Sequence, residues 1–369
     1  MRQIETVNII GGGIAGLTTA LALQTNGIHY NLFEQNAEIT YQNVGLGISA
    51  NIFHILEEWN ILEETKQIGT EIRNFHFVDN QLNYIKSFKL QRPALSVNRR
   101  QFYKLLYSHL DNQSIHLDSK KSIEDFSEND IVISAEGINS KTRQEIYPNL
   151  KLRDSNQILF RGISEIELDE KFKNAYHDFV GQNIRFAIIH TGKNYYSWYI
   201  IKEKNVGEKI SLDKVVLKSY FTNYNSVVGK IIDKSENVYT AELLDINPKN
   251  RKDLRWFIKN TLLIGDAIHP TTPNMANGAC LTMEDSYLFA SLFGDNKLTL
   301  RQVFEIFQKK RTSKIDPVVF QSWWFGKLLH QKNKTIDRLV KMGMSLTPKF
   351  LFDKIYSRIL AETKIEKPI

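Results

Sequence analysis

Apolar and polar positions in the first 35 residues predict a strand, a helix and a second strand. The run at 7–10 is apolar throughout and is typical of a buried strand. Small and apolar residues follow it, and Asn26-Gly27 marks the end of the expected helix. A second apolar run then ends at Glu34. This order of elements is typical of the first unit of an α/β sheet.

The middle of the chain carries a different pattern, rich in aromatic and β-branched residues. Residues 74–90 predict two short strands, and 156–203 contain several strand-like runs that we interpret as antiparallel. A helix is expected at 97–110, and a buried strand followed by a glycine turn at 130–143. An antiparallel sheet inserted between parts of an α/β domain is the usual form of a substrate-binding layer.

The last third begins with a strand at 262–264 and a loop that contains two prolines within four residues. The prolines stiffen this loop, which leads to a helix expected from about Ala279. From 301 onward the chain is helical and basic, with breaks expected at Gly326, Gly343 and Pro348. The predicted fold class is therefore α/β, with an inserted antiparallel-sheet domain and a helical C-terminal region.

The glycines of the first turn indicate a nucleotide site. Gly11, Gly13 and Gly16 have the spacing G-x-G-x-x-G, in which the second glycine lets the backbone approach a pyrophosphate. The helix N-terminus behind them suits an anion. Glu34 ends the next strand, where a carboxylate can accept hydrogen bonds from ribose hydroxyls. We expect a dinucleotide with an ADP moiety, and NAD and FAD satisfy these residues equally well.

Composition narrows the class of protein. At 369 residues the chain is expected to form about two domains, because single cores stop growing beyond ~250–300 residues. The net charge of +7 is spread along the chain, which argues against a nucleic-acid partner. The single cysteine excludes an intramolecular disulfide and a cysteine metal cluster. No signal region or transmembrane run is evident, so we expect a cytoplasmic protein without a metal.

Later motifs distinguish the cofactors through a resemblance. The order of GGGIAG (11–16), GLGI (45–48), VNRR (97–100), SAEGINSKTR (134–143) and GDAIHPTTPNMANGACLTMEDS (265–286) resembles the single-component FAD-dependent aromatic hydroxylases. This is the p-hydroxybenzoate hydroxylase family, and its salicylate- and urate-hydroxylase-like branch is the nearest. The resemblance covers nearly the whole chain and makes the first domain a Rossmann-like FAD-binding domain.

The resemblance implies a division of the chain and a set of FAD-binding positions. Segments 1–73, 95–155 and 240–300 would form the FAD-binding domain, 74–94 and 156–239 the substrate-binding sheet, and 301–369 the C-terminal helices. The glycine turn would hold the pyrophosphate, Glu34 the adenosine ribose, Asp266 the ribityl chain, and the loop that ends at Gly278 the flavin ring. The complete implied set is Gly11, Gly13, Ala15, Gly16, Glu34, Gln35, Gly47, Arg99, Gly265, Asp266, Pro273, Ala276, Asn277 and Gly278.

Three positions depart from the pattern of the family. Glu136-Gly137 stands where the family has Asp-Gly, and Ala276-Asn277-Gly278 where it has Gly-Gln-Gly. Gln42 and Asn43 replace an arginine that often precedes GLGI. The methyl group of Ala276 narrows access of the backbone to the flavin, which bears on the geometry of the loop.

The implied activity is that of a monooxygenase. NADH or NADPH, bound transiently, reduces FAD, and a flavin hydroperoxide transfers one oxygen atom of O₂ to an electron-rich, aromatic small molecule. A flavin-dependent halogenase or epoxidase on the same fold, and a non-catalytic FAD-binding protein, are alternatives. A plain NAD-dependent dehydrogenase would be colourless. The sequence assigns no oligomeric state.

Other side chains carry open interpretations. Arg185, Tyr196 and Trp198 on the predicted strands either line a substrate pocket or form the hydrophobic side of a sheet, and Arg161 is a second cation there. No residue stands out as a general base. We expect His269 to order its loop and Cys280 to be packing. The Trp323-Trp324 pair belongs either to the core or to a surface that binds a partner. The basic tail 327–349 is either a solvated helix or a surface that touches a membrane.

Overall fold

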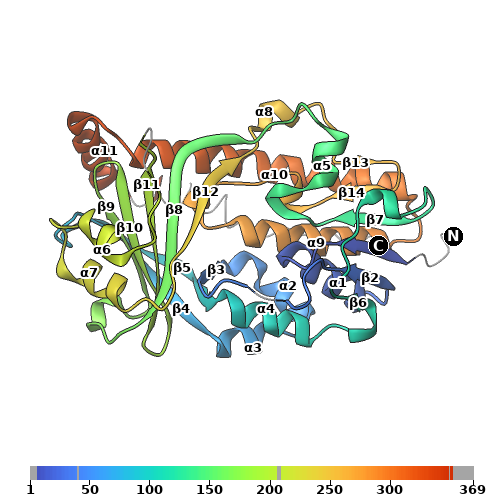
Figure 1. Cartoon of the computed structure of the whole chain (residues 1–369), viewed down its shortest axis with the longest axis horizontal. Helices are drawn as coiled ribbons and strands as arrows, with labels where there is room; N and C mark the ends of the chain where they lie inside the picture. Colours follow the sequence, from blue (N-terminus) through green and yellow to red (C-terminus); the bar gives the residue numbers. More distant parts are fainter. Residues whose placement is uncertain (1–5, 40, 206–208, 349, 352–369) are drawn as a thin grey trace.

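Two sheets lie at opposite ends of the molecule, and two long helices run beside them (Figure 1). The computed structural model describes residues 6–39, 41–205, 209–348 and 350–351. The predicted C-terminal helical region extends into 349 and 352–369, which lie outside the described residues. The arrangement confirms the predicted α/β class with an added, mostly antiparallel sheet and C-terminal helices.

The first sheet has the strand order β13-β14-β7-β1-β2-β6 and is parallel except for the β13–β14 pair. Every residue of β1 is buried, as expected for a strand covered on both faces by helices. The predicted order of strand, glycine turn, helix and strand is confirmed. Its elements are β1 (Val7–Ile10), α1 (Ile14–Thr25), β2 (Tyr30–Phe33), α4 (Arg99–Ser108), β6 (Ile115–His116), β7 (Ile131–Ser134), α5 (Lys141–Ile146), β13 (Phe257–Ile258), β14 (Thr261–Leu263) and α9 (Gly278–Gly294).

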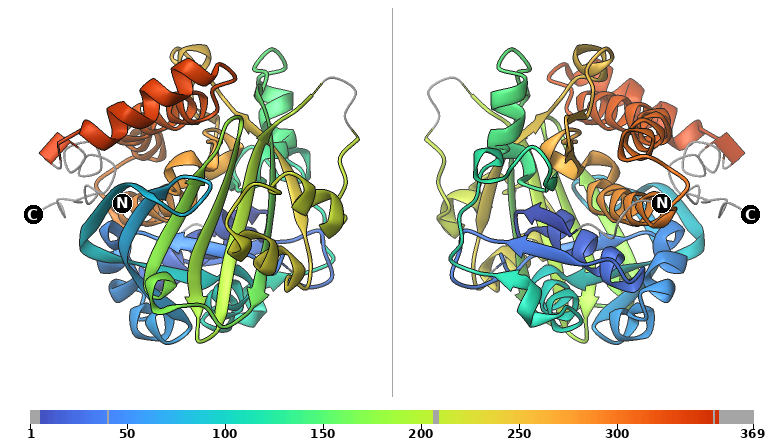
Figure 2. Two further views of the ribbon diagram at one scale, coloured as in Figure 1. Left: turned by 90° about the vertical axis from the view of Figure 1, so that its left-hand side faces the viewer. Right: turned by 90° about the vertical axis from the view of Figure 1, so that its right-hand side faces the viewer.

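The second sheet has the order β12-β8-β11-β10-β9-β4-β5-β3, and all its pairs are antiparallel except β4–β9. The short helices α6 and α7 cover one face (Figure 2). Its elements are β3 (Gly45–Ile48), β4 (Gly69–Val78), β5 (Tyr84–Asn98), β8 (Arg153–Glu165), β9 (Ala175–Val180), β10 (Ile184–Gly192), β11 (Tyr195–Glu203), α6 (Lys214–Ser219), α7 (Ser226–Asp233) and β12 (Tyr239–Asp245). The connections also contain α2 (Phe53–Glu58), α3 (Leu62–Gln67) and α8 (Pro248–Arg251).

The C-terminal region consists of α10 (Leu300–Leu329) and α11 (Lys334–Leu346). The prediction that Gly326 and Gly343 break the helices is wrong, because both lie inside them. A β-carbon at Gly326 would lie 2.3 Å from Asn274 Nδ2, so glycine is required there for close packing. Within the part of the chain that the structure describes, no helix is long and apolar enough to cross a membrane.

His177 on β9 is fully buried in an aromatic cluster. Its ring lies 4.7 Å from the rings of both His76 and Phe172. Neither ring nitrogen has a hydrogen-bond partner among the described residues. Burial lowers the pKa of His177 to about 3, and the nearby positive charges of His76 and Lys171 act in the same direction. The native state therefore holds this imidazole neutral.

We predict that His177 makes the protein less stable at acidic pH. Between pH 6.5, the ordinary pKa, and about 3, the unfolded chain binds a proton that the native chain does not, so stability falls with pH. Between pH 7 and 5, the unfolding free energy of the parent should fall by ~2 kcal/mol more than that of the variant His177→Phe. Urea titrations at both pH values measure this difference. Equal slopes for His177→Phe and parent would contradict the assignment.

Candidate functional site

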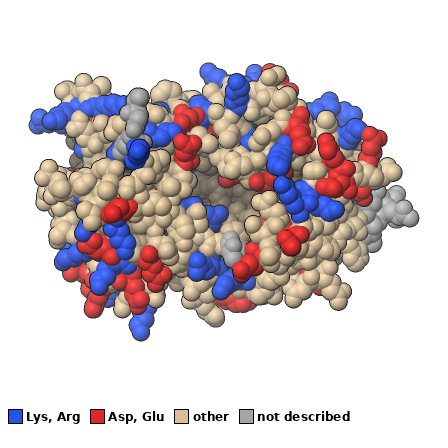
Figure 3. Space-filling view, viewed as in Figure 1, with Lys and Arg blue, Asp and Glu red and all other residues tan. Residues whose placement is uncertain are grey.

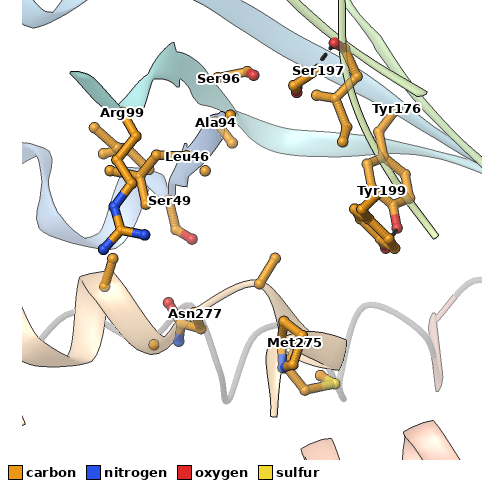
Figure 4. A pocket seen from close by; sticks show the side chains of 18 of the residues that line it. Leu46, Ser49, Ala94, Ser96, Arg99, Tyr176, Ser197, Tyr199, Met275 and Asn277 are labelled. Carbon is orange, nitrogen blue, oxygen red and sulfur yellow. Dashed lines mark hydrogen bonds between the residues drawn. The ribbon is translucent and has the colours of Figure 1, made fainter. Parts of the chain in front are cut away.

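A cavity of about 480 Å³ lies between the two sheets. The N-terminal residues of α1 and α9 line it on one side, and strands of the second sheet line it on the other. Figure 3 shows the surface hollowed between the two units, and Figure 4 shows the lining from close by. Nine predicted cofactor residues border the cavity: Gly13, Ala15, Gly47, Arg99, Asp266, Pro273, Ala276, Asn277 and Gly278. The other five, Gly11, Gly16, Glu34, Gln35 and Gly265, are not among the lining residues.

The three glycines of the first turn have different physical roles. Gly11 has a φ of +106°, and a β-carbon there would lie 2.7 Å from the carbonyl oxygen of Ala135. A β-carbon at Gly16 would lie 1.8 Å from the carbonyl oxygen of Gly11, so glycine allows α1 to pack on β1. Around Gly13 nothing lies within 4 Å of that position. The turn therefore opens to the cavity at Gly13, at the N-terminus of α1.

Glu34 supports this turn from the end of β2. Its Oε2 accepts a hydrogen bond of 2.7 Å from the Gly12 amide, and its Oε1 accepts one of 2.9 Å from the Asn36 amide. The carboxylate is buried, whereas Gln35 is exposed. Glu34 thus fixes the backbone beside the cavity and keeps its negative charge close to the glycine turn.

Asp266 presents a carboxylate to the cavity. Its side chain is exposed there, and no described residue donates a hydrogen bond to it. Because the cavity wall surrounds Asp266 and displaces bulk water, desolvation raises the pKa of this carboxyl, while the neighbouring His269 and Arg99 oppose the rise. A carboxylate whose hydrogen-bond capacity is unused in this way suits a ligand with several hydroxyl groups. The cavity therefore fits the polyol chain of a flavin at this position.

A buried cluster of charges fixes the Gly265-Asp266 turn. Asp285 Oδ2 accepts a hydrogen bond of 2.9 Å from the Gly265 amide and lies 2.6 Å from His269 Nε2. Arg311 Nε donates to Asp285 Oδ1 at 2.5 Å and Arg311 Nη1 donates to Glu284 at 2.9 Å. His269 lies outside the cavity lining in this cluster, which supports the expectation that it orders the loop.

Cys280 lies in the first turn of α9 and is fully buried. Its sulfur accepts a hydrogen bond of 3.3 Å from the Ser49 amide. Burial raises the pKa of the thiol to about 11, so the thiolate that a nucleophile requires is disfavoured. Cys280 is packing, as the sequence suggested.

The loop that leads into α9 contains a non-glycine residue in the left-handed region. Ala276 has a φ of 49° and a ψ of 30°, a conformation that favours glycine. It stands at a position where the related pattern has glycine. A β-carbon at Gly47 would lie 3.9 Å from the carbonyl oxygen of Ala276, so the backbone of the strained residue lies close to β3.

Two arginines make one end of the cavity positive. Arg99 Nη2 donates to the Tyr103 hydroxyl at 2.9 Å, and Arg161 Nη2 donates to Gln42 Oε1 at 2.7 Å. Burial lowers the pKa of Arg161 to about 10, and repulsion by Arg99 adds to the effect. These hydrogen-bond partners are neutral, so the charges of the guanidinium groups are available to an anion such as a pyrophosphate.

The other end of the cavity contains a neutralised ion pair. Arg185 is 1% exposed; its Nε donates to Asp178 Oδ1 at 3.2 Å and its Nη1 donates to Asn274 Oδ1 at 3.1 Å. The Tyr176 hydroxyl donates to Asp178 Oδ2 at 2.9 Å and is hydrogen-bonded to the Tyr199 hydroxyl. Burial and the Asp178 charge raise the pKa of Tyr176 well above its usual value, so the phenol stays protonated. In Figure 4 these two tyrosines lie at the end opposite Arg99.

The sequence analysis missed Tyr176, Asp178 and Tyr199. One signal was present, because an aspartate inside the apolar run AYHDFV of β9 requires a buried partner. Tyr196 was a substrate candidate, but the structure places it in the apolar cluster under α6 and α7, with its ring 5.1 Å from that of His190. Trp198 borders the cavity, yet its indole stacks on Phe186 and donates to Ser235 Oγ at 3.2 Å. The alternation of side chains along β11 correctly placed Tyr196 and Trp198 on the same face of the sheet. That face is the outer one, which α6 and α7 cover.

We predict that Ala276→Gly stabilises the protein by about 1 kcal/mol, because glycine adopts the left-handed conformation without the cost of a β-carbon. Denaturant unfolding of the flavin-free chain measures the change. Ala279→Gly is the control, since this position is inside α9, where glycine should destabilise by ~0.5–1 kcal/mol. The same sign for both variants would contradict the strain at Ala276.

Known proteins match this chain over most of its length. A family model described as an FAD binding domain matches residues 4–147. The chain is 23% identical to aurachin C monooxygenase/isomerase of Stigmatella aurantiaca, over 79% of this chain and 81% of that protein. It is 23% identical to 3-hydroxybenzoate 6-hydroxylase of Polaromonas naphthalenivorans, with 94% of each covered. The structure of Klebsiella pneumoniae HpxO complexed with FAD and uric acid superimposes with a TM-score of 0.86 at 19% identity, over 97% of each chain. The chain thus contains an FAD-binding domain and is similar over most of its length to FAD-dependent hydroxylases, as the sequence motifs had indicated.

Proposed function

We propose that this protein is an FAD-dependent monooxygenase that uses NADH or NADPH and O₂ to hydroxylate an uncharged, largely apolar aromatic molecule. The observation that carries the proposal is the asymmetry of the cavity. One end joins two helix N-termini, two arginines and the Asp266 carboxylate, and the other is apolar with two phenols. Such a cavity can hold a dinucleotide and an aromatic molecule side by side.

At the first end, the residues would hold FAD in a defined order. The amides behind Gly13 would bind the pyrophosphate at the N-terminus of α1, with Arg99 beside them. Asp266 would accept hydrogen bonds from the ribityl hydroxyls, and the amides at 276–278 would meet the polar edge of the ring. When bound, FAD supplies the reduction by NAD(P)H and the activation of O₂ that the protein itself lacks. We propose the full set of predicted positions on this basis. We also propose the domain boundaries given above, except that β3 and β12 pair into the second sheet.

At the second end, the protein would bind and shield the substrate. Apolar side chains from β4, β5 and α10 exclude water from the reacting atoms, which protects a reactive oxygen species from wasteful decay. The residues that do so are Ile72, Phe75, Phe77, Leu90 and Phe325. Because the Tyr176 proton goes to Asp178, the Tyr199 hydroxyl donates to Tyr176, and its oxygen, which borders the cavity, can accept a hydrogen bond from a substrate hydroxyl.

The charge of Arg185 does not favour an anionic substrate. Asp178 already neutralises this charge, and the side-chain oxygen of Asn274 accepts a hydrogen bond from another N–H of the guanidinium. A carboxylate brought to Arg185 would meet the Asp178 charge, while the Arg185 charge is already neutralised, which costs binding energy. The arrangement therefore favours an uncharged aromatic ring with a group that donates a hydrogen bond.

Matched ligands test this proposal. Purified protein should be yellow, lose its colour with NADH or NADPH without O₂, and regain it in air. NAD(P)H oxidation should respond to 4-hydroxyquinoline at concentrations at least about tenfold lower than to 4-hydroxyquinoline-2-carboxylate. Product analysis by mass spectrometry should show one added oxygen atom. Preference for the carboxylate would refute the uncharged substrate class, and a protein that takes up no flavin would refute the monooxygenase.

We also predict that Asp266→Ala weakens FAD binding about 10- to 100-fold, because hydrogen bonds to a charged group contribute roughly 1.5–3 kcal/mol. Flavin absorbance after dialysis against known FAD concentrations measures the affinity. Asp253→Ala removes an exposed carboxylate elsewhere and should bind FAD like the parent. Parental affinity in Asp266→Ala, with circular dichroism showing a folded chain in both variants, would remove Asp266 from the cofactor site.

A further inference from the structure

The two C-terminal helices expose an unusual amount of apolar surface. Phe320, Trp324 and Leu328 follow one another at four-residue spacing on α10 and are 54%, 56% and 46% exposed. On α11 the exposed apolar residues are Ile336 (45%), Leu339 (55%), Met342 (53%) and Leu346 (73%). These seven residues, the helical apolar face, lie on consecutive helices that contact each other. Single exposed apolar residues are ordinary, but a set aligned along two helices marks an interaction surface.

Basic residues flank this face on α11. Lys334 and Arg338 are exposed, and neither forms an ion pair with a described residue. In contrast, Lys341 pairs with Asp337 at 2.7 Å on the side toward the protein. Lys and Arg also gather in Figure 3 at the corner where Figure 1 shows α11. An apolar face bordered by unpaired cations is typical of a helix that lies in the interface of an anionic membrane.

The opposite side of α11 connects this face to the cavity. Met344 and Val340 pack into an apolar cluster with Phe88, Leu329 and four cavity-lining residues, which are Phe75, Phe77, Leu90 and Phe325. The helix therefore lies between the exposed face and the apolar end of the cavity. Figure 2 shows α11 at the periphery of the molecule, where a flat surface can reach it.

We propose that the helical apolar face docks the protein on the surface of a membrane containing anionic lipids. α11 has 13 residues and a length of about 20 Å, which is too short to span a bilayer and suits a helix lying in its plane. The apolar residues enter the boundary between head groups and acyl chains, while Lys334 and Arg338 meet lipid phosphates. Docking brings the apolar end of the cavity close to a source of lipophilic molecules, although the binding itself does not depend on the proposed activity.

A second copy of the chain is a less suitable occupant. In a symmetric dimer the same patch meets itself, so Lys334 and Arg338 of two copies would approach one another. The net charge of +7 adds repulsion over a longer range. Anionic lipid compensates the same charges, so charge complementarity favours the membrane.

Vesicle sedimentation of the full-length flavoprotein tests the proposal. The protein should bind vesicles of phosphatidylcholine with 30 mol% phosphatidylglycerol at least about tenfold more strongly than vesicles of phosphatidylcholine alone, and salt should weaken the binding. Lys334→Glu/Arg338→Glu should lose at least tenfold in partitioning. Lys120→Glu/Lys141→Glu, which makes the same change of net charge at exposed positions in the other unit, should bind like the parent.

Two further variants separate the apolar contribution and locate the contact. Leu339→Ser/Met342→Ser should reduce partitioning at least tenfold while flavin content and circular dichroism stay unchanged. Brominated lipids should quench the fluorescence of Trp324, and Trp324→Phe should lose that quenching but still sediment. Equal binding of parent and both helix variants, or no binding to anionic vesicles, would overturn the proposal. A concentration-dependent dimer in light scattering that Leu339→Ser/Met342→Ser abolishes would assign the face to a second copy instead.

Discussion

The buried carboxylate of Asp285 is the interaction on which the cavity depends. It binds the Gly265 amide, His269 and Arg311, and so joins the turn after β14, the following loop and α10 through one side chain on α9. Desolvation of such charges is expensive, and the cost is offset only when every partner is present. Removing one partner would leave an uncompensated buried charge, which typically costs about 3–5 kcal/mol. The geometry of the loop is therefore determined by this buried cluster and not by the residues that line the cavity.

The same principle connects the two ends of the cavity. Asn274, in the loop that this cluster holds, accepts a hydrogen bond from Arg185 on β10 and donates one of 3.2 Å to the backbone carbonyl of Ser322 on α10. Gly326 lets α10 approach Asn274 closely, and Phe325 beside it reaches the apolar end. One amide thus links the first unit, the second sheet and the C-terminal helix. A change in the loop at the cofactor end is transmitted to the substrate end through direct contacts.

The part of this arrangement that the sequence predicted is the part determined by local constraints. The spacing of Gly11, Gly13 and Gly16 follows from a single strand–turn–helix unit, and its prediction needed no distant contact. The face of β11 that meets the cavity depends instead on which side α6 and α7 cover, and alternation is the same for both sides. Gly326 was misread for a related reason. A glycine in a helix and a glycine that ends one look alike until the neighbouring Asn274 is known.

Charge is distributed unevenly along the cavity and on the surface beyond it. Arg99 and Arg161 have neutral hydrogen-bond partners in the cavity, whereas the charge of Arg185 at its other end is cancelled by Asp178. Beyond that end, α11 turns apolar side chains and two unpaired cations outward. An uncharged aromatic molecule that leaves a membrane for the apolar end of the cavity would lose no hydration of a charge, whereas a charged molecule of the same shape would. The exposed face and the apolar end of the cavity therefore favour the same chemical class through separate sets of residues.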